Sequence, residues 1–365
     1  MKNTSVGIGI IGTGFGTVVA APAFAAATGA SVNGIYSRNL TRARAEAARL
    51  GVPFATDQMS ELCERADVDL VFVATPPHLH RDAVLTALDA GKHVACEKPF
   101  GLGPAEALEM LERATEARRL HFLDFEFRTD PARRALAALI ERGDLGDVHQ
   151  VVVTAMVAGA RFPVMNREGW WLRSEDGGGW LGAMGSHYVD ALRAWFGEIR
   201  SVAAHLEVRR EHLSSAGATT PITADDGFCA RLTTESGIVC TINSVSTIGA
   251  EIGPRIEMYG TSRTAVLEND RFLRIVDDAG NATTRHFAAD VVHSHPSRGP
   301  LEAWAEQIVE AVAAGRQLTP SFLDGLRCQE VMAAARRSHR RGGVVTPVEQ
   351  HPHESATPTN RAAVS

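Results

Sequence analysis

The chain has 365 residues, of which 45% are hydrophobic and 22% are charged, and its net charge is −6. This composition is typical of a globular protein, and the length predicts two domains. The negative charge argues against nucleic acid or an acidic membrane surface as a partner. No apolar segment is long enough to cross a bilayer and the N-terminus shows no leader, so we expect a cytoplasmic protein. The five cysteines are scattered, without metal-ligand spacing, which predicts reduced core residues and no metal site.

The first apolar segment, residues 6–11, runs into a glycine-rich turn and then an alanine-rich stretch. This order of strand, turn and helix is typical of dinucleotide-binding folds, in which Gly12 permits the tight turn and Gly14 lets the backbone approach a pyrophosphate. The third glycine of the pattern falls at Thr17, a residue small enough to permit close packing. We therefore assign cofactor binding to Gly12, Gly14 and Phe15.

The end of the second predicted strand, residues 31–36, bears on the choice of cofactor. An acidic residue at this place would bind the ribose 2′-hydroxyl, whereas an arginine accommodates a 2′-phosphate. This chain has Ser37 and Arg38 and no acid there. The pattern favours NADP over NAD, although Arg38 could instead stack on adenine.

Residues 69–74 and 94–96 read as buried strands, and each runs directly into a polar segment that contains proline. In open α/β sheets, ligands bind at the carboxyl ends of the strands. His80, in the segment after residue 74, could instead only pack or cap the next helix. The candidate cofactor contacts at this edge are Thr75, Pro76, His80, Glu97 and Lys98.

Strand and helix patterns alternate over about the first 125 residues, which predicts an α/β fold with a doubly wound parallel sheet. The pattern then changes to strand-like segments with few helices, which predicts an α+β domain with a large, mostly antiparallel sheet. We divide the chain into a dinucleotide-binding domain at 1–126, a second domain at 127–348 and a disordered tail at 349–365. The strands predicted in the second domain are 149–157, 202–208, 227–233, 238–245, 255–259, 264–267 and 272–276, and its helices are 131–142, 186–196, 301–314 and 322–341.

A glycine-rich segment interrupts the second domain just before the predicted helix 186–196. His187 and Asp190 are three residues apart and share a face near the start of that helix, where they could present an imidazole and a carboxylate to a cleft between the domains. A histidine hydrogen-bonded in the core is the alternative for His187. Trp171 flanks the same segment and could line the substrate side or pack in the core.

Five motifs, in this order, resemble the glucose-fructose oxidoreductase, inositol dehydrogenase and rhizopine-catabolism (Gfo/Idh/MocA) family. The resemblance covers about residues 5–348. It implies an N-terminal Rossmann domain and a C-terminal domain whose large open sheet makes homodimer or homotetramer contacts. It also implies a pyridine-nucleotide oxidoreductase acting on sugars, glycosides, cyclitols or related polyols. The motifs are GTGFG at 12–16, TPPHLH at 75–80, EKP at 97–99, FEFR at 125–128, and GGG at 177–179 with GSHYVD at 185–190.

The resemblance implies that Lys98 is the catalytic lysine and His187 the active-site histidine. The expected reaction is the reversible oxidation of a secondary alcohol, with hydride transfer to nicotinamide and proton transfer to this pair. Many members have an aspartate four residues before the histidine, where this chain has Ala183. A carboxylate at Asp190 or Glu126 could replace it. The candidate substrate-binding residues are Glu126, Arg128, Trp171 and Asp190.

Two other functions fit the same motifs. A nucleotide-binding sensor would keep the fold without turnover; Ala183 favours this mildly, and the presence of Lys98 and His187 argues against it. An enzyme that retains and internally recycles its cofactor, as in redox-assisted glycoside cleavage, is the second alternative.

Overall fold

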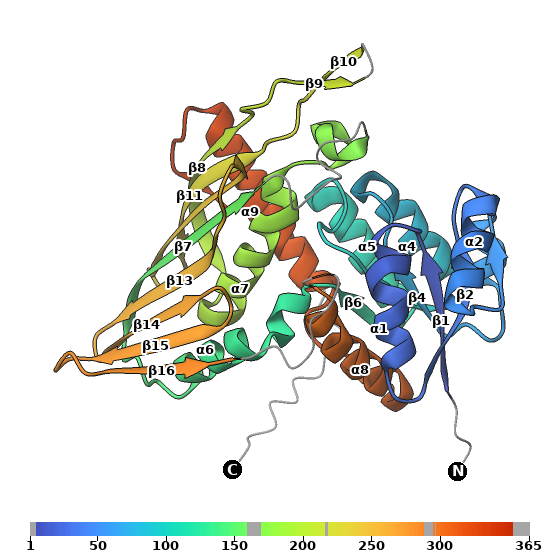
Figure 1. Cartoon of the computed structure of the whole chain (residues 1–365), viewed down its shortest axis with the longest axis horizontal. Helices are drawn as coiled ribbons and strands as arrows, with labels where there is room; N and C mark the ends of the chain where they lie inside the picture. The colour runs from blue at the N-terminus through green and yellow to red at the C-terminus, as the bar shows by residue number, and fades with distance from the viewer. Residues whose placement is uncertain (1–4, 159–168, 216–217, 288–294, 296, 353–365) are drawn as a thin grey trace.

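The computed structural model describes residues 5–158, 169–215, 218–287, 295 and 297–352. A six-stranded sheet and a nine-stranded sheet form the frame, and most of the helices lie between or beside them (Figure 1). None of the helices in those residues is both long enough and apolar enough to span a membrane.

The six-stranded sheet is parallel throughout, with the strand order β3-β2-β1-β4-β5-β6. Every residue of β1 and β4 is buried because helices cover both faces of the sheet. This arrangement confirms the predicted doubly wound fold. The elements are β1 (Val6–Ile11), α1 (Ala21–Ala26), β2 (Ala30–Tyr36), α2 (Leu40–Leu50), β3 (Ala55–Thr56), α3 (Met59–Cys63), β4 (Leu70–Val73), α4 (His80–Asp89), β5 (His93–Cys96), α5 (Pro104–Glu116) and β6 (His121–Leu123).

The second sheet has the order β16-β15-β14-β13-β7-β12-β11-β8-β17. Only the β7–β12 pair is parallel among its described strands, which confirms a large, mostly antiparallel sheet. The sequence did not predict β16 or β17, because β16 is exposed along its whole length and β17 has only two residues. The strands are β7 (Val148–Ala158), β8 (Ile199–Glu207), β11 (Gly227–Thr234), β12 (Val239–Ile248), β13 (Ile252–Gly260), β14 (Arg263–Glu268), β15 (Phe272–Asp277), β16 (Ala282–His286) and β17 (Thr346–Pro347), with a separate hairpin of β9 (His212–Ser215) and β10 (Ala218–Pro221).

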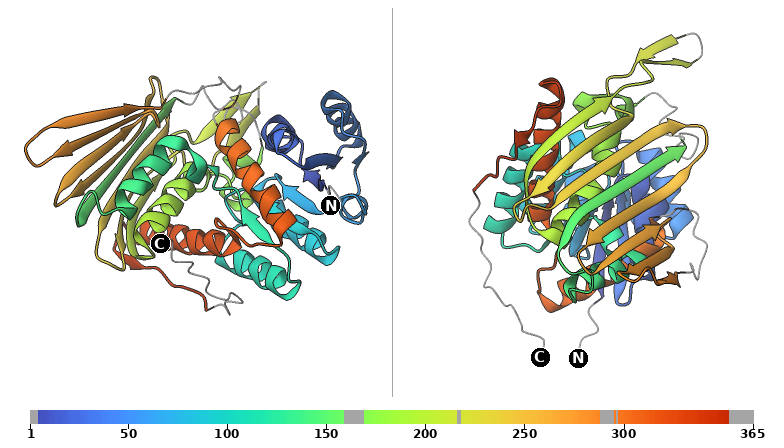
Figure 2. Two further views of the ribbon diagram at one scale, coloured as in Figure 1. Left: turned by 90° about the horizontal axis from the view of Figure 1, so that it is seen from below. Right: turned by 90° about the vertical axis from the view of Figure 1, so that its left-hand side faces the viewer.

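Helices cover one face of the nine-stranded sheet. They are α6 (Pro131–Glu141), α7 (Ser186–Phe196) and α9 (Phe322–Arg340), which lie between this sheet and the first domain (Figure 1). The opposite face carries no helix in the described part of the chain (Figure 2, right). Four of the five cysteines are buried as expected, but Cys229 of β11 is exposed.

The end of the chain returns to the first domain. Helix α8 (Arg298–Ala314) packs against α1, and its apolar face joins the core around β1 through Leu301, Trp304 and Ile308. In α9, the side-chain amide of Gln329 donates to the carbonyls of Phe100 and Gly101. These contacts fix the second sheet and its helices against the carboxyl edge of the parallel sheet.

The tail predicted for 349–365 falls into two parts. Residues 349–352 are described, and the backbone N–H of His351 donates to Glu330 of α9 over 2.6 Å. Residues 353–365 lie outside the described residues.

Candidate active site

The glycine turn after β1 has the shape that a dinucleotide requires. Gly12 adopts φ +114°, and a Cβ atom there would lie 2.4 Å from the carbonyl oxygen of Ala74. A Cβ at Gly14 would meet no atom within 4 Å, so this position borders open space. Close packing falls at Gly16 rather than at the expected Thr17, because a Cβ at Gly16 would come within 2.9 Å of Ile10. The turn therefore combines a backbone that only glycine tolerates with open space beside it, which fits a bound pyrophosphate.

Basic and hydroxyl side chains lie at the end of β2. Ser37 Oγ accepts a hydrogen bond from the backbone N–H of Asn39, which in turn caps helix α2. Arg38 is exposed, and the guanidinium of Arg42 donates to the carbonyl of Thr13 in the glycine turn over 3.0 Å. The place expected for a ribose 2′ substituent is thus flanked by two arginines.

The side chain of His80 contacts the segments that follow β4 and β5. Its imidazole is fully buried, with Nε2 2.7 Å from the Thr75 carbonyl and Nδ1 3.1 Å from the Pro99 carbonyl. Burial lowers the pKa of His80 to about 4, so the ring is neutral and carries one N–H, which we assign to the shorter contact at Nε2. Both ring nitrogens face carbonyl groups, and the ring positions the loop at Thr75-Pro76 against the loop that carries Lys98.

Lys98 reaches across to the second domain. It follows β5, precedes Pro99 in a cis peptide, and its Nζ donates to the carbonyl of Ala183 over 3.1 Å. Ala183 lies in the π-helical turn Leu181–Gly185, immediately before α7. The glycines of this segment permit the approach, because a Cβ at Gly182 would lie 3.3 Å from Pro99. The cross-domain contact therefore brings the amine of Lys98 to the start of the helix that carries His187.

His187 is the second residue of α7, whose bounds Ser186–Phe196 agree with the prediction. Its ring stacks on Phe127 with centroids 4.1 Å apart, and its Nε2 lies 3.9 Å from Glu126 Oε2. Burial, with smaller effects from Lys98 and Arg133, holds the pKa of His187 well below its usual value. The imidazole is therefore neutral, and its Nδ1 has no hydrogen-bond partner in the described residues.

Three carboxyl groups are buried beside Lys98. Glu97 and Asp124 follow the paired strands β5 and β6, and Glu126 lies two residues further on. Burial raises the pKa of all three, and that of Glu126 reaches about 7. Glu97 Oε1 and both oxygens of Asp124 have no hydrogen-bond partner among the described residues, and the charge of Glu97 adds to burial in raising the pKa of Asp124. We call Glu97, Asp124 and Glu126 the carboxyl cluster.

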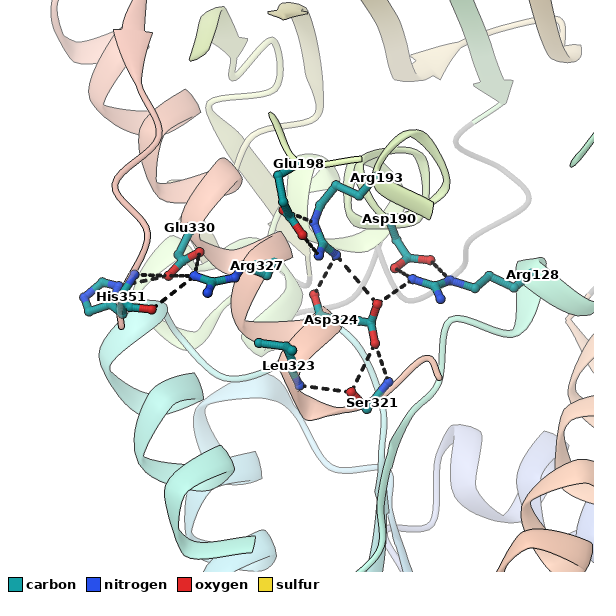
Figure 3. A network of polar contacts seen from close by, with 10 residues as sticks. All are labelled: Arg128, Asp190, Arg193, Glu198, Ser321, Leu323, Asp324, Arg327, Glu330 and His351. Carbon is teal, nitrogen blue, oxygen red and sulfur yellow. Dashed lines mark hydrogen bonds and ion pairs between the residues drawn. The ribbon is translucent and has the colours of Figure 1, made fainter. Parts of the chain in front are cut away.

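Arg128 and Asp190 form an ion pair, so the carboxylate of Asp190 is not available beside His187 as the sequence had suggested. The guanidinium of Arg128 donates to both Asp190 oxygens, at 2.8 and 2.6 Å, and to Asp324 of α9 at 2.8 Å (Figure 3). Arg193 of α7 forms a bidentate pair with Glu198 and contacts the same Asp324. Asp190 is therefore committed to an arginine, which leaves Glu126 as the carboxylate nearest to the imidazole.

A cavity adjoins the histidine between α6 and α7. It brings together three of the predicted site residues, Arg128, His187 and Asp190, and its other walls include Phe127, Arg133 and Trp195. Trp171 is half-buried and packs edge-to-face on Trp170, with ring centroids 5.2 Å apart.

Sequence reasoning missed two residues near Lys98. The first is Asp124, and its signal in the sequence is an acid inside the apolar stretch HFLDF. His295 lies before α8, with its ring 5.6 Å from that of Phe15 in an edge-to-face contact. Burial and the charge of Lys98 lower the pKa of His295, so the glycine turn, Lys98 and the segment before α8 meet in one place. No pattern in the sequence predicted that contact.

Two family models match this chain. Residues 6–125 match an oxidoreductase family with an NAD-binding Rossmann fold, and residues 133–266 match the Gfo/Idh/MocA C-terminal domain. The chain belongs to the Gfo/Idh/MocA family. It is accordingly an NAD-binding oxidoreductase, as the order of its motifs predicted.

Two relatives of this Gfo/Idh/MocA member are named for sugar substrates. Levoglucosan dehydrogenase of Pseudarthrobacter phenanthrenivorans is 26% identical, over 89% of this chain and 93% of that protein. The 1,5-anhydro-D-fructose reductase of Ensifer adhaerens is 30% identical, over 67% of this chain and 70% of that protein. A structure of levoglucosan dehydrogenase with NADH and levoglucosan has the same fold, with a TM-score of 0.85, 22% identity, and coverage of 94% of this chain and 100% of that one.

Proposed function

We propose that this oxidoreductase interconverts a secondary alcohol and a ketone on a sugar, glycoside, cyclitol or related polyol. The observation that carries the proposal is the contact between Lys98 and Ala183, which joins the end of β5 to the first turn before His187. An amine, a neutral imidazole and the glycine turn thereby lie around one edge of the parallel sheet, where ligands of such sheets bind. The named relatives support a sugar-like substrate.

The proposed division of labour follows from the charges of the two groups. The bound nicotinamide supplies the hydride chemistry. Lys98 Nζ holds the reacting oxygen, exchanging its bond to the Ala183 carbonyl for one to the substrate. The imidazole of His187 is neutral, so one of its ring nitrogens has a lone pair that can take a proton as the carbonyl forms. Glu126, Arg128, Trp171 and Asp190 are the proposed substrate-side residues, with the Arg128–Asp190 pair presenting one wall of the cavity.

For the cofactor we propose NADP, with NAD as the alternative. Ser37 and the exposed Arg38 offer a hydroxyl and a cation to a 2′-phosphate, and Arg42 lies beside them on α2. The remaining proposed contacts are Gly12, Gly14, Phe15, Thr75, Pro76, Glu97 and Lys98, with His80 acting through the two carbonyl groups that it holds.

For the assembly we propose a homodimer or homotetramer formed through the uncovered face of the nine-stranded sheet (Figure 2, right). No helix of the described residues lies on this face, so its strands can meet a second copy directly. A second copy of this chain is the partner that the family resemblance implies.

One experiment tests the activity. The purified protein is titrated with NADPH and NADH, and polyols and sugars are then screened for a change in nicotinamide absorbance. We expect turnover with NADP, and a loss of about 10²–10⁴-fold in kcat for Lys98→Ala at saturating cofactor. Binding without turnover on any substrate would support the sensor, and cofactor that co-purifies and does not exchange would support internal recycling. A Lys98→Ala variant within a few-fold of wild type would refute the assignment of Lys98.

A further inference from the structure

We propose that Glu126 is the carboxylate to which His187 passes the substrate's proton. The proposal rests on the oxidoreductase function above and adds to it a positioning and proton-holding residue that lies outside α7. Its basis is the buried pairing of Glu126 Oε2 with His187 Nε2 at the junction of the two domains.

Glu126 Oε2 and His187 Nε2 face each other in a buried contact. The two side chains are each about 2% exposed, and 3.9 Å separates Oε2 from Nε2. Oε2 has no donor among the described residues, and the remaining imidazole nitrogen, Nδ1, has no partner there either. A contact of this length is common for catalytic pairs before substrate binds, and it shortens to a hydrogen bond with a small rotation of either side chain.

The pairing fixes which nitrogen of His187 holds the hydrogen. A carboxylate facing Nε2 favours the tautomer with N–H at Nε2 and the lone pair at Nδ1. The imidazole can then take a proton at one nitrogen while it gives one up at the other. Phe127 stacks on the ring and restrains its orientation during this exchange.

The other nearby acids are unsuited to the task. Asp190 is held by both N–H groups of the Arg128 fork. Glu97 and Asp124 lie at the ends of β5 and β6, and among the described residues no ion pair joins either of them to His187. The residue at the end of the Lys98 contact is Ala183, which has no side-chain acid.

The surroundings of Glu126 keep it able both to take and to release a proton. Burial raises its pKa, the charge of Lys98 lowers it, the charge of Glu97 raises it, and a hydrogen bond from Ser297 lowers it, for a net value of about 7. An acid with a pKa near neutrality can exchange a proton in either direction of the reaction. The polar groups facing this site are Lys98, Glu97 and Asp124 from the first domain, His187 from α7, Arg133 from α6, and His295 and Ser297 before α8.

The step balances in atoms and charge. In the oxidation, a bound nicotinamide would accept the carbinol hydrogen together with the electron pair of the C–H bond. The O–H bond breaks, its electron pair forms the carbonyl, and its proton binds an imidazole nitrogen of His187. The proton at Nε2 moves to the Glu126 carboxylate, and His187 is neutral again at the end. Nothing besides NAD(P) is consumed.

The sign of the pH dependence follows from this step. Oxidation requires ionised Glu126, so kcat/KM rises with pH up to about 7 and then levels off. Reduction requires protonated Glu126, so its kcat/KM falls as the pH rises through the same value. If Glu126 had only a structural role, its replacement would leave the pH dependence of kcat/KM unchanged for both the oxidation and the reduction.

The test compares Glu126→Gln with Glu126→Asp and with Glu330→Gln. Glu330 is an equally buried acid on α9 that pairs with Arg327, so its variant controls for the loss of a buried carboxylate. We expect Glu126→Gln to lower kcat about 10²-fold and to abolish the change of kcat/KM with pH near 7. Glu126→Asp should keep this pH dependence. Glu330→Gln should keep both the kcat and the pH profile of the wild type. An unchanged pH profile in a folded Glu126→Gln protein would refute the proposal.

A second readout does not require a substrate. Histidines are labelled with ¹⁵N, and the His187 signals are assigned by their loss in His187→Asn. We expect Nε2–H in wild type and a changed tautomer ratio in Glu126→Gln, with no change in Glu330→Gln. The same His187 tautomer in wild type and Glu126→Gln would refute the pairing. If the tautomer responds but no polyol is oxidised, the pairing stands and the proposed oxidation is wrong.

Discussion

Two groups of buried charged side chains lie next to each other, and they differ in how their charges are paired. Glu126 of one group and Arg128 of the other are two positions apart in the chain. The network of Arg128, Asp190, Arg193, Glu198 and Asp324 joins each carboxylate to a guanidinium (Figure 3). The carboxyl cluster of Glu97, Asp124 and Glu126 has three acids against the single amine of Lys98, and four of its oxygens lack a donor among the described residues. In the arginine network the two guanidinium groups lower the pKa of Asp324, although burial still leaves that of Asp190 raised, whereas the pKa of every acid in the cluster is raised.

We infer that the arginine network has a structural role and that the carboxyl cluster has a functional one. The arginine network fastens the segment after β6 to α7 and α9, and its charges are paired in the folded state only. The cluster next to it keeps acids with raised pKa values between Lys98 and His187. Perturbed acids of this kind are concentrated at functional sites. Replacing an acid by its amide should consequently have opposite effects on stability in the two groups.

The largest effect is expected for Asp324→Asn in the arginine network. Burial acts to raise the pKa of Asp324, but Arg128 and Arg193 outweigh it and the net pKa is lowered. We expect the amide to lower the free energy of unfolding by about 3 kcal/mol at pH 7, because two buried guanidinium groups lose a shared partner. Urea denaturation of wild type and variant measures this loss.

The pH dependence checks the cause of that loss. A carboxyl group with a lowered folded pKa contributes stability above its unfolded pKa of about 4, and this is lost as the pH falls through the folded value. The gap between wild type and Asp324→Asn should therefore narrow below pH 4. A gap of less than 1 kcal/mol at pH 7 would mean that the network does not fasten the domains.

A smaller effect of the opposite sign is expected for Asp124→Asn in the carboxyl cluster. Burial, and then the charges of Glu97 and Glu126, raise the pKa of Asp124 well above its usual value. Its stabilising protonated form is favoured at low pH and is lost as the pH rises through the folded pKa. An amide resembles the protonated acid and does not titrate, so we expect the variant to be more stable than wild type by about 1 kcal/mol at pH 8.

That difference should shrink as the pH falls, because Asp124 of the wild type becomes protonated. Thermal unfolding at several pH values provides the comparison, with Asp324→Asn as the matched acid-to-amide control. A destabilised Asp124→Asn protein at pH 8 would show that Asp124 is ionised and paired in the folded state, contrary to the contrast drawn above.

Local patterns in the sequence were enough to predict most of the fold. The parallel sheet, the glycine turn and helix α7 were predicted because burial and glycine geometry leave a mark within a few neighbouring residues. The exposed strand β16 left none. The position of α8 against α1 was also not predictable, because an apolar helix face does not specify the surface on which it packs.

The site was predictable only as a set of residues. The motifs named Lys98 and His187, but no pattern indicated that Arg128 would bind Asp190 and leave Glu126 for the imidazole. Those pairings connect residues 61 or 62 positions apart and depend on how α7 meets the segment after β6. Electrostatic partners are chosen by tertiary packing, which single-sequence patterns do not encode.

The smallest effect is expected for an ion pair outside both groups. Arg81 of α4 and Glu109 of α5 form a bidentate pair whose Nε–Oε2 distance is 2.7 Å, and both side chains are more than a third exposed. Water solvates these charges in the unfolded and the folded chain alike, so pairing changes little on folding. We expect Arg81→Gln to leave the unfolding midpoint of wild type unchanged within error, with or without added salt. A loss comparable to that of Asp324→Asn would show that geometry, rather than burial, gives the arginine network its strength, and the contrast between the two buried groups would then need another cause.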